Sequence, residues 1–491
     1  MAFGVTRATG QPAPVVYDRR ATLWCCLGAG FATLLDGAVV AFTAPSVQSS
    51  LGLGDSATLW FLSAFSLTFG LGLAPAGRLG DAYGRRGLFL AGLGLFLIGC
   101  VASAGAVGTW SVILGRLVQG FGAGVISAQV LGVIQDVFTG PDRLRALARY
   151  SAAGAAAAIA GPVLAGVALW LLPAEFAWRV VLLLPIPFTL ATIALGVRGL
   201  PRVPRARRAT DLDLPGIAAL GLLVVLVTVP IIDPGLPGAA IVAVCVLGCG
   251  LAVGLACWER HYARTGRLPL FAPALMRSRG YVTGNVVALL WFGSSLAFHT
   301  VKTIYLMQVC EIPALAIALS LIPSALARIV ASGWGQRLFA THGPPLVTYG
   351  LVVHTGCLAA SAGATAFSDG WTLFFVLAAI QIAFGLSSGV VEPPLRVVTL
   401  AFSPSSLHGV AASFLQLTQR LSATVCIALC TGVLLAFGGT ASSASLRWAT
   451  ILCAAASAVA TAASFSRYFR TDAPPTVPET PEPGMDSSGV A

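Results

Sequence analysis

Long apolar stretches separated by short polar loops recur along almost the whole chain. A helix needs about 20 apolar residues to cross a bilayer. The pattern therefore predicts an all-α polytopic membrane protein with fourteen transmembrane helices. We expect them over residues 21–43, 57–77, 87–107, 111–137, 148–171, 178–198, 213–232, 238–258, 281–306, 313–338, 345–366, 371–392, 409–436 and 446–466.

The charge of the connecting loops alternates along the chain. Arginines gather in every second loop, as in residues 85–86, 143–149 and 202–208, whereas the intervening loops carry single acids such as Asp55 and Glu311. By the positive-inside rule, both termini are expected in the cytoplasm. That placement requires an even number of spans, which the count of fourteen satisfies. We expect the protein in the plasma membrane.

The composition excludes a soluble globular protein. Apolar residues make up 57% of the 491 positions and charged residues 10%, against about 25% charged residues in soluble proteins. The net charge of +11 lies mainly in loops, so it indicates topology and contact with anionic lipid rather than nucleic-acid binding. Lys302 is the single lysine among 29 basic residues, and this bias suggests a bacterial source.

Nothing in the sequence predicts a metal site, a cofactor or a catalytic residue. The eleven cysteines include no CxxC pair and lie almost entirely in apolar segments, where cysteine behaves as a small hydrophobe. The glycine-rich segment 120–124 follows no strand and precedes no Lys-Ser/Thr pair, so it is not a phosphate loop. We therefore expect no enzyme activity.

Two stretches resemble each other and suggest an internal repeat. Gly77-Arg78-Leu79-Gly80-Asp81-Ala82-Tyr83-Gly84-Arg85-Arg86 ends the second predicted helix, and Gln336-Arg337-Leu338-Phe339-Ala340-Thr341-His342-Gly343 ends the tenth. Parallel repeats of six helices are a known transporter architecture. We expect a cytoplasmic N-terminal tail (1–20), a six-helix bundle (21–198), linkers with an inserted two-helix hairpin (199–280), a second six-helix bundle (281–466) and a disordered cytoplasmic tail (467–491).

These motifs resemble those of the major facilitator superfamily. The loop over residues 77–86 is similar to its signature between helices 2 and 3, and the fourteen spans resemble its drug:proton antiporter branch. Further matches follow in order: Leu35-Asp36 with Ala44-Pro45 in helix 1, Leu114-Gly115-Arg116-Leu117-Val118-Gln119-Gly120 in helix 4, Gly161-Pro162-Val163-Leu164-Ala165-Gly166 in helix 5 and Trp178-Arg179 at the start of helix 6. The resemblance implies the major facilitator fold.

The loop signature is interpreted as a conformational latch. Its members are Gly77, Asp81, Gly84, Arg85 and Arg86. An acid at a helix terminus can cap the helix and bridge basic groups of the opposite bundle. The alternative is that the arginines only anchor the loop in the cytoplasm. The second repeat has Ala340 in place of Asp81, which argues against a symmetric latch.

Asp36 and Arg116 are the leading candidates for proton coupling. A carboxylate inside a span costs roughly 2.5–3.5 kcal/mol on insertion scales, so its presence suggests a function. Both residues are expected about 10 Å below the outer face, at 1.5 Å of helix per residue. Burial disfavours the ionised carboxylate and Arg116 favours it, so relative movement makes a proton bind or leave. The alternative is a static pair that joins two helices.

Helix 5 is expected to form a close contact between the bundles. Gly154, Gly161, Pro162 and Gly166 lie in a run of small residues without charge. Small residues let helix backbones approach closely, and Pro162 removes one backbone donor and bends the helix. The resemblance identifies this stretch as the antiporter motif.

Four more charges fall inside predicted spans. Glu392 either pairs with Arg396 at i,i+4 or provides a second proton site. Lys302 and Arg328 are long enough to snorkel to the interface, and Arg420 is expected to line a cavity. The histidines His299 and His354 are expected to form hydrogen bonds between helices.

The substrate is expected to lie among polar and aromatic side chains between the bundles. A hydrophobic or cationic compound can stack on aromatic rings. The candidate residues for this cavity are Gln119, Phe65, Trp291, Phe298, Gln416 and Arg420.

The sequence thus predicts a monomeric exporter that expels a drug-like amphipathic small molecule in exchange for protons. Its expected partners are that molecule, protons and membrane lipids. One alternative is a proton-linked importer of a sugar or metabolite, but Leu200-Pro201-Arg202-Val203-Pro204 lacks the acidic motif of sugar porters. Another is an integral-membrane transferase, which would need a paired-carboxylate or His-Asp loop at the membrane face.

Overall fold

The computed structural model describes residues 18–201, 213–232, 236–267, 273–404, 408–436 and 442–470. Every regular element in these ranges is a helix. The expected tails (1–20 and 467–491) lie mostly outside the described residues, as does most of the linker before the inserted hairpin.

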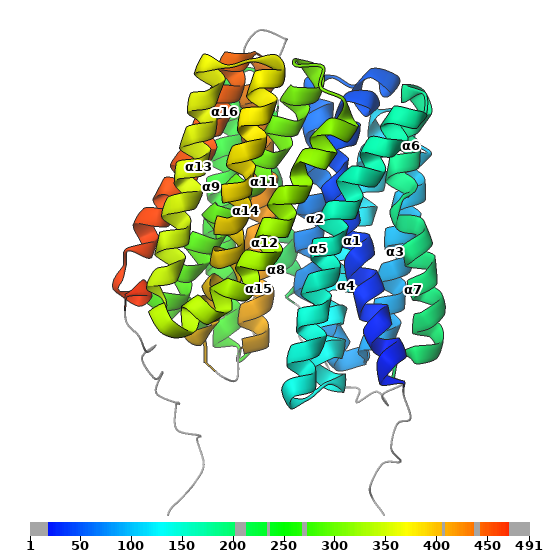
Figure 1. Cartoon of the computed structure of the whole chain (residues 1–491). Helices are drawn as coiled ribbons and strands as arrows, with labels where there is room; N and C mark the ends of the chain where they lie inside the picture. The colour runs from blue at the N-terminus through cyan, green and yellow to red at the C-terminus, as the bar shows by residue number, and fades with distance from the viewer. Residues whose placement is uncertain are drawn as a thin grey trace, which may run out of the picture.

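The helices follow one another with short connections (Figure 1). The N-terminal group comprises α1 (Arg19–Leu51), α2 (Asp55–Tyr83), α3 (Arg85–Ala104), α4 (Thr109–Val137), α5 (Gly140–Leu171), α6 (Ala174–Leu183) and α7 (Pro185–Gly199). It is followed by α8 (Leu214–Ile232), α9 (Gly238–Arg264) and the short α10 (Pro273–Arg277). The C-terminal group comprises α11 (Arg279–Gln308), α12 (Ala314–His342), α13 (Pro345–Phe367), α14 (Gly370–Ala401), α15 (His408–Ala436), α16 (Ser443–Ser464) and a 3-10 turn (Arg467–Phe469).

The predicted all-α membrane architecture is confirmed. Thirteen helical segments of the described residues are long and apolar enough to cross a membrane, and Leu214–Pro230 adds a shorter apolar helix. One of the thirteen, Glu175–Gly199, contains both α6 and α7. The break falls at Pro185, which has no backbone N–H to donate into the preceding turn.

Several helices are longer than their apolar stretches predicted. The first helix extends to Leu51, eight residues past the predicted end at residue 43. The prediction followed the apolar stretch, whereas the helix continues through the more polar residues that come after it. The predicted end of α14 at residue 392 was wrong, since that helix continues through Pro393 and Pro394 to Ala401. Close packing against α12 supports this stretch, where Gly389 lies against the carbonyl of Arg328.

The helices pack as two groups that meet along defined pairs. Within the N-terminal group α4 packs on α2 and α3, and α1 packs on α5 and α7; within the C-terminal group α12 packs on α14 and α11 on α15. The groups touch through α2 with α15, α5 with α12 and α1 with α11. The inserted hairpin sits at this seam, because α8 contacts both α2 and α15 while α9 packs on α8. The exact domain boundaries stay a prediction.

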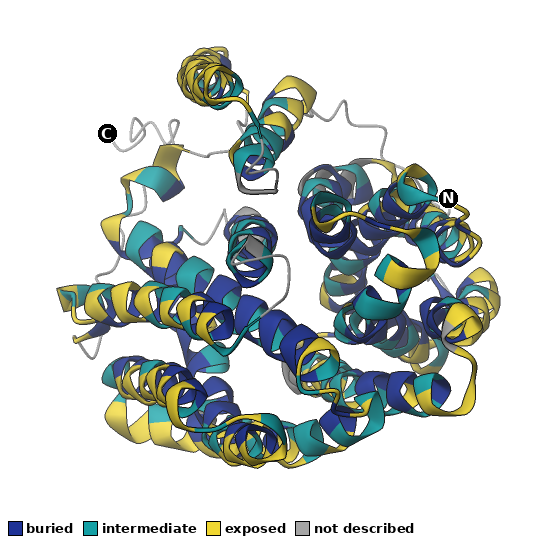
Figure 2. Cartoon of the chain, turned by 90° about the horizontal axis from the view of Figure 1, so that it is seen from above, coloured by how far each residue is buried: buried dark blue, intermediate teal, exposed yellow. Residues whose placement is uncertain are grey.

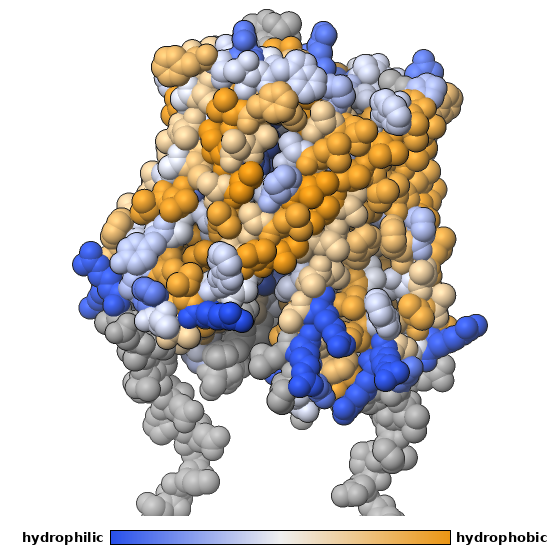
Figure 3. Space-filling view, viewed as in Figure 1, coloured by the Kyte–Doolittle hydropathy of each residue, from blue (hydrophilic) through white to orange (hydrophobic). Residues whose placement is uncertain are grey.

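The outer surface is apolar in its middle and polar at its two ends (Figure 3). Seen from above, buried positions face the interior of the helix groups and exposed positions face outwards (Figure 2). Large apolar side chains such as Phe367, Val246 and Phe375 are well exposed there. In water such a surface would aggregate, whereas lipid tails accommodate it, as a multi-pass membrane protein requires.

The apolar core is shared by the two helix groups at one end of the molecule and divided at the other. We call the end with Arg85, Arg86 and Arg145 the basic end. At the opposite end, one cluster contains Leu53 and Trp178 from the N-terminal group together with residues of the C-terminal group. At the basic end, one cluster lies wholly in the N-terminal group, and the other belongs mainly to the C-terminal group but includes Leu67 of α2 and Val224 of α8. The groups are therefore closed on one another at the opposite end.

The closing contact at the opposite end depends on a glycine in α5. A Cβ atom at Gly166 would lie 2.7 Å from Cα of Leu315 in α12, too close for two carbon atoms. Nearby, Nε2 of Gln308 donates a hydrogen bond of 3.2 Å to Oε1 of Gln48. Gly166 and Gln48 belong to the N-terminal group, and Leu315 and Gln308 belong to the C-terminal group. Both contacts therefore join the two groups.

Substituting Gly166 by valine is expected to hold the opposite end apart. The added side chain cannot fit against the backbone of Leu315. Spin labels at Gln48→Cys and Gln308→Cys should show a longer distance by electron resonance, and transport should fall by about tenfold or more.

The control is Gly94→Val in α3, because nothing lies within 4 Å of a Cβ atom there. The exposed Cys245, Cys249 and Cys257 are first replaced by serine to keep the labels specific. An unchanged distance in the Gly166→Val protein would show that the glycine does not determine closure.

Candidate functional site

Asp36, Arg116 and Gln119 form a fully buried polar network inside the N-terminal group. Nη1 of Arg116 donates to both carboxylate oxygens of Asp36, at 3.0 and 2.8 Å. It also donates to Oε1 of Gln119 at 2.8 Å, and Nε2 of Gln119 donates back to Asp36 at 2.8 Å. All three residues have 0% exposure. The pairing expected from their depth is present, and Gln119 joins it as a third member.

Two aromatic rings of α2 cover the remaining side of the guanidinium group. The ring centroids of Phe65 and Phe61 lie 4.7 and 5.7 Å from Cζ of Arg116. Nε and Nη2 of Arg116 have no hydrogen-bond partner among the described residues, so the rings provide the contact on that side. Phe65 and Gln119 were expected in a substrate cavity. Here both are buried against the ion pair instead.

Close backbone approach builds this site around α4. A Cβ atom at Gly99 of α3 would lie 2.4 Å from Cα of Gln119, and one at Gly124 would lie 2.1 Å from the carbonyl oxygen of Phe69 in α2. Glycines therefore let α2 and α3 pack directly on α4. Water is excluded as a result, and the polar side chains must satisfy one another.

The small residues of α5 connect this network to the seam between the groups. A Cβ atom at Gly161 would lie 3.1 Å from Ala38 and 3.2 Å from the carbonyl of Leu35, on the two sides of Asp36. Gly154 likewise faces Leu34. Five residues after Gly161, at Gly166, the same helix contacts α12. Pro162 lies inside the unbroken helix α5.

The predicted latch residues contact mainly their own helix group. Nε of Arg85 lies 2.5 Å from Oδ2 of Asp136 at the end of α4, and Arg86 donates to the carbonyl of Val197 in α7. Gly84 joins α2 to α3 at a φ of 92°, a backbone angle that favours glycine. The side chain of Asp81 lies outside the described part of the structure. The latch therefore stays a prediction.

Gly77 is the latch residue that faces the other helix group. A Cβ atom there would lie 3.9 Å from Oγ of Ser413 in α15. This contact belongs to the packing of α2 on α15.

Glu392 is held between two arginines. It accepts a hydrogen bond from Nη2 of Arg328 in α12 and lies 3.7 Å from Nη2 of Arg396, one turn along α14. The expected i,i+4 pair is thus present, but the closer partner comes from another helix. Arg328 is itself exposed, so its expected snorkelling stays a prediction.

Lys302 lies in a buried polar cluster of the C-terminal group. The prediction that it snorkels to the interface was wrong. Its side chain is 2% exposed, and Nζ donates to Oε1 of Gln381 in α14. Nε2 of Gln381 lies 3.2 Å from Nδ1 of His299. A buried amide of the neighbouring helix thus draws the ammonium group inwards.

The two membrane histidines form hydrogen bonds between helices, as predicted. Nε2 of His354 in α13 lies 3.1 Å from Oγ of Ser295 in α11. Its ring centroid lies 4.2 Å from that of Phe384 and 6.1 Å from that of Trp291, and Phe298 lies 5.7 Å from Phe384. Trp291 and Phe298 are each 3% exposed. In this conformation they pack in the core instead of lining an open cavity.

Arg420 lies between the two helix groups. Its Cζ is 4.2 Å from the ring centroid of Phe69 in α2 and 5.4 Å from that of Phe292 in α11. It is partly exposed, as is Gln416 one turn earlier in α15. The structure therefore brings Arg420 and Gln416 together at the seam, apart from the buried Asp36 network.

Three residues near these sites were missed by sequence reasoning. Gln129 is fully buried and donates to the carbonyl of Ala76 at 2.6 Å. Gln381 joins Lys302 to His299. A glutamine inside an apolar span costs free energy unless it is hydrogen-bonded. The position of Gln129 and Gln381 in apolar stretches could therefore have identified both residues from the sequence. Tyr150 of α5 gave no such signal, because it lies at the polar edge of its span.

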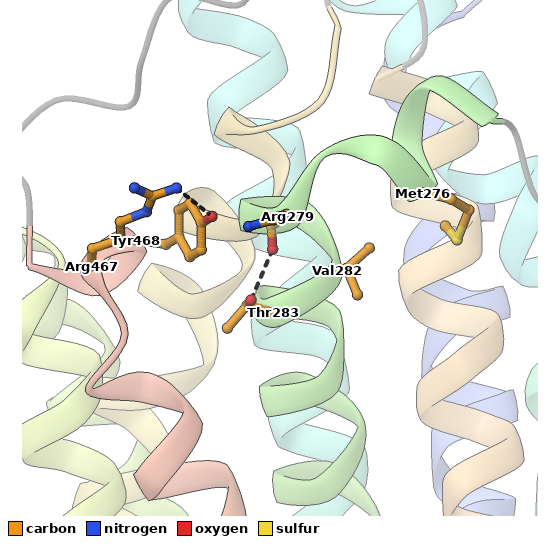
Figure 4. A pocket seen from close by; sticks show the side chains of 6 residues that line it. All are labelled: Met276, Arg279, Val282, Thr283, Arg467 and Tyr468. Atoms are coloured by element: carbon orange, nitrogen blue, oxygen red, sulfur yellow. Dashed lines mark hydrogen bonds between the residues drawn. The ribbon is translucent and has the colours of Figure 1, made fainter.

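The structure also has a surface hollow of about 480 Å³ at the basic end. It is lined by Met276, Arg279, Val282, Thr283, Arg467 and Tyr468 (Figure 4). No residue predicted from the sequence as functional belongs to it. Within the described residues, no group of three or more His, Cys, Asp or Glu side chains is placed to hold a metal ion.

Comparisons with known proteins agree with this architecture. The model of the Major Facilitator Superfamily matches residues 26–425. The chain is 29% identical over 425 residues to the probable actinorhodin transporter of Streptomyces coelicolor, covering 85% of this chain and 72% of that protein. It is 29% identical over 415 residues to the puromycin resistance protein pur8 of Streptomyces alboniger, covering 82% and 79%.

Among solved structures, the POT family transporter PepTSo has the same fold. The superposition gives a TM-score of 0.66 at 14% identity and covers 93% of this chain and 99% of that one.

Removing either partner of the Asp36–Arg116 pair is expected to destabilise the protein unequally. Breaking a buried pair costs about 3–5 kcal/mol, because the remaining charge is unpaired. Asp36→Asn leaves a guanidinium group that cannot lose its charge, whereas Arg116→Gln leaves a carboxylate that can take up a proton. Thermal unfolding in detergent should therefore show the larger loss for Asp36→Asn.

The pH dependence and the double variant provide the checks. The free energy of unfolding of the Arg116→Gln protein should rise as pH falls. The unpaired buried carboxylate of the folded state then takes up a proton at a pH at which the unfolded state still does not. The double variant should lose less than the two single losses together. Arg145→Gln, which breaks an exposed pair with Asp142, is the control. Equal, pH-independent losses would contradict the expected asymmetry.

Proposed function

The chain belongs to the major facilitator superfamily, and we propose that it exports an amphipathic, drug- or antibiotic-like small molecule in exchange for protons. Membership of this family makes it a secondary transporter of a small molecule in a membrane, and not an enzyme. The proposal adds the direction of transport, the class of compound and the coupling ion. It also assigns the chain to the fourteen-helix drug:proton antiporters, as a monomer in the plasma membrane with both termini in the cytoplasm.

The buried Asp36–Arg116–Gln119 network carries this proposal. Asp36 is an ionisable group on α1, and both of its carboxylate oxygens are bound by side chains of α4. A small displacement of α1 along α4 would remove these donors from a carboxylate that lies in an apolar interior. An unpaired carboxylate there is expected to take up a proton. The site therefore links protonation to the relative position of two helices.

The packing of α5 provides a route from this site to the seam. Gly161 lies on α1 beside Asp36, and Gly166 of the same helix lies on α12 of the other group. A shift of α1 on protonation would therefore move α5, and with it the contact between Gly166 and α12 that closes the opposite end. We propose that this is how the proton site and the alternation of access are coupled. The latch residues of the loop over residues 77–86 are proposed to stabilise one of the two states.

The membrane potential can drive such an exchange without ATP. It contributes about 2.3 kcal/mol per charge per 100 mV. At an RT of about 0.59 kcal/mol, this supports a concentration ratio of roughly fifty for each charge moved. The relatives support the class of compound, because two of them are named for actinorhodin and for puromycin. A proton-linked importer remains the alternative, distinguished by the direction of flux.

We expect purified protein in liposomes to exchange actinorhodin for protons. An imposed pH gradient should drive the compound against its concentration, and a pH-sensitive dye should report the opposing proton flux. Asp36→Asn should lower this coupled flux by at least about tenfold, because the side chain no longer binds a proton. Binding of the compound should remain, since Asp36 is buried away from the seam.

Glu392→Gln is the matched control, because Glu392 is also a carboxylate within a span but lies between two arginines. We expect it to retain proton coupling. Coupled flux that survives Asp36→Asn and disappears with Glu392→Gln would move the proton site to α14. Flux of the compound in the same direction as the protons would favour the importer.

A further inference from the structure

The charges inside the spans are not balanced. Among the described residues, Asp36 is bound by Arg116, and Glu392 is shared by Arg328 and Arg396. These two carboxylates are therefore already paired.

Of the cations predicted inside the spans, Lys302 and Arg420 have no carboxylate partner at ion-pair distance among the described residues. Lys302 is buried against the amide of Gln381. Arg420 differs from it in being partly exposed. An unpaired guanidinium group within a membrane is costly, and an accessible one can be neutralised by a ligand.

Arg420 lies at the seam between the two helix groups. Its guanidinium group packs on Phe69 from the N-terminal group and on Phe292 from the C-terminal group. It is also within electrostatic range of Tyr150 in α5, and of Glu392 and Arg396 in α14. Side chains of four other helices, from both groups, thus contact it or act on it electrostatically. A compound bound here would contact both halves of the transporter.

We propose that the transported compound is an amphipathic anion whose acid group pairs with Arg420 and whose rings pack on Phe69 and Phe292. This inference rests on the proposed export function and names its class of substrate. A guanidinium group presents parallel N–H donors that match a carboxylate or sulfonate. The two aromatic rings provide an apolar surface next to that charge.

The same charges disfavour a cationic compound. The carboxylates of Asp36 and Glu392 are already bound by arginines. Arg420 already occupies the faces of Phe69 and Phe292 that could hold a cation. A cationic compound would also approach the unpaired charge of Arg420 and that of the neighbouring Arg396. Like charges brought together away from water repel strongly. The earlier expectation of a hydrophobic or cationic compound is therefore replaced by an anionic one.

Two xanthene dyes of opposite charge test the inference directly. Fluorescein is anionic and rhodamine 123 cationic, and they share a ring system. We expect fluorescein to bind the purified protein in nanodiscs at least about tenfold more tightly, a difference of 1.4 kcal/mol, as measured by fluorescence anisotropy. Arg420→Gln should lower the affinity for fluorescein by about tenfold or more. Arg420→Lys should restore part of that affinity, since lysine keeps the positive charge but lacks the parallel N–H donors of the guanidinium group.

Arg337→Gln is the matched control, because Arg337 is an exposed arginine of α12. It should leave both affinities unchanged, and thermal unfolding should show that each variant is folded. Tighter binding of rhodamine 123, no binding of fluorescein, or an Arg420→Gln protein that binds fluorescein as the unchanged protein does would each overturn the inference.

A membrane potential separates this inference from the proposed function. Exchange of one anion outwards for one proton inwards moves two charges, whereas a one-for-one exchange of a cation moves none. A potassium gradient with valinomycin should therefore accelerate fluorescein export. Proton-coupled export of rhodamine 123 without fluorescein export would retain the export function and reject the anionic substrate. Fluorescein transport that depends on Arg420 but carries no protons would retain the anionic substrate and reject the coupling.

Discussion

The central constraint on this structure is that a carboxylate and a guanidinium group lie together, fully buried among the helices of the N-terminal group. Asp36 and Arg116 are both fully buried, and each would be costly without the other. Their pairing fixes α1 against α4, and the glycines of α3 and α4 make the approach close enough to exclude water. The remaining packing of the N-terminal group follows from keeping this site dry. Because a carboxylate can bind a proton and a guanidinium group cannot release one, the same constraint gives the site its proposed chemistry.

Among the described residues, the two helix groups meet through close helix packing at small residues, one glutamine–glutamine hydrogen bond and the contact of Arg420 with Phe69, with no ion pair identified between them. Gly166 allows α5 to touch α12 at the opposite end, and α2 lies along α15 through Gly70 and Gly77. Contacts of this kind depend on shape and have no strong directional bonds, so they can separate and re-form at modest cost. The ion pairs identified in the described part of the chain each lie within one helix group. Packing contacts between the groups and ion pairs within each group suit two bodies that rock against each other while each keeps its internal structure.

The C-terminal group buries polar residues in a different way. Lys302, Gln381 and His299 form a chain of hydrogen bonds without a carboxylate, whereas the N-terminal group uses an ion pair. The excess of positive charge therefore lies on the C-terminal side of the seam, where Arg420 faces the rings of Phe69 and Phe292. The inferred preference for an anion follows from this asymmetry between the halves.

The sequence by itself determined the all-α membrane architecture and the residues of the leading ion pair, because burial of charge in a membrane is so costly that each exception is visible in an apolar stretch. Only the tertiary structure decided which charges pair. Arg328 and Glu392 are far apart in sequence but touch across α12 and α14, and Lys302 turns inwards because Gln381 offers it an acceptor. Likewise, Gln119 and Phe65 belong to the ion-pair site instead of a cavity. Helical periodicity gives the depth of a side chain, whereas its partner depends on the rotation and packing of a second helix.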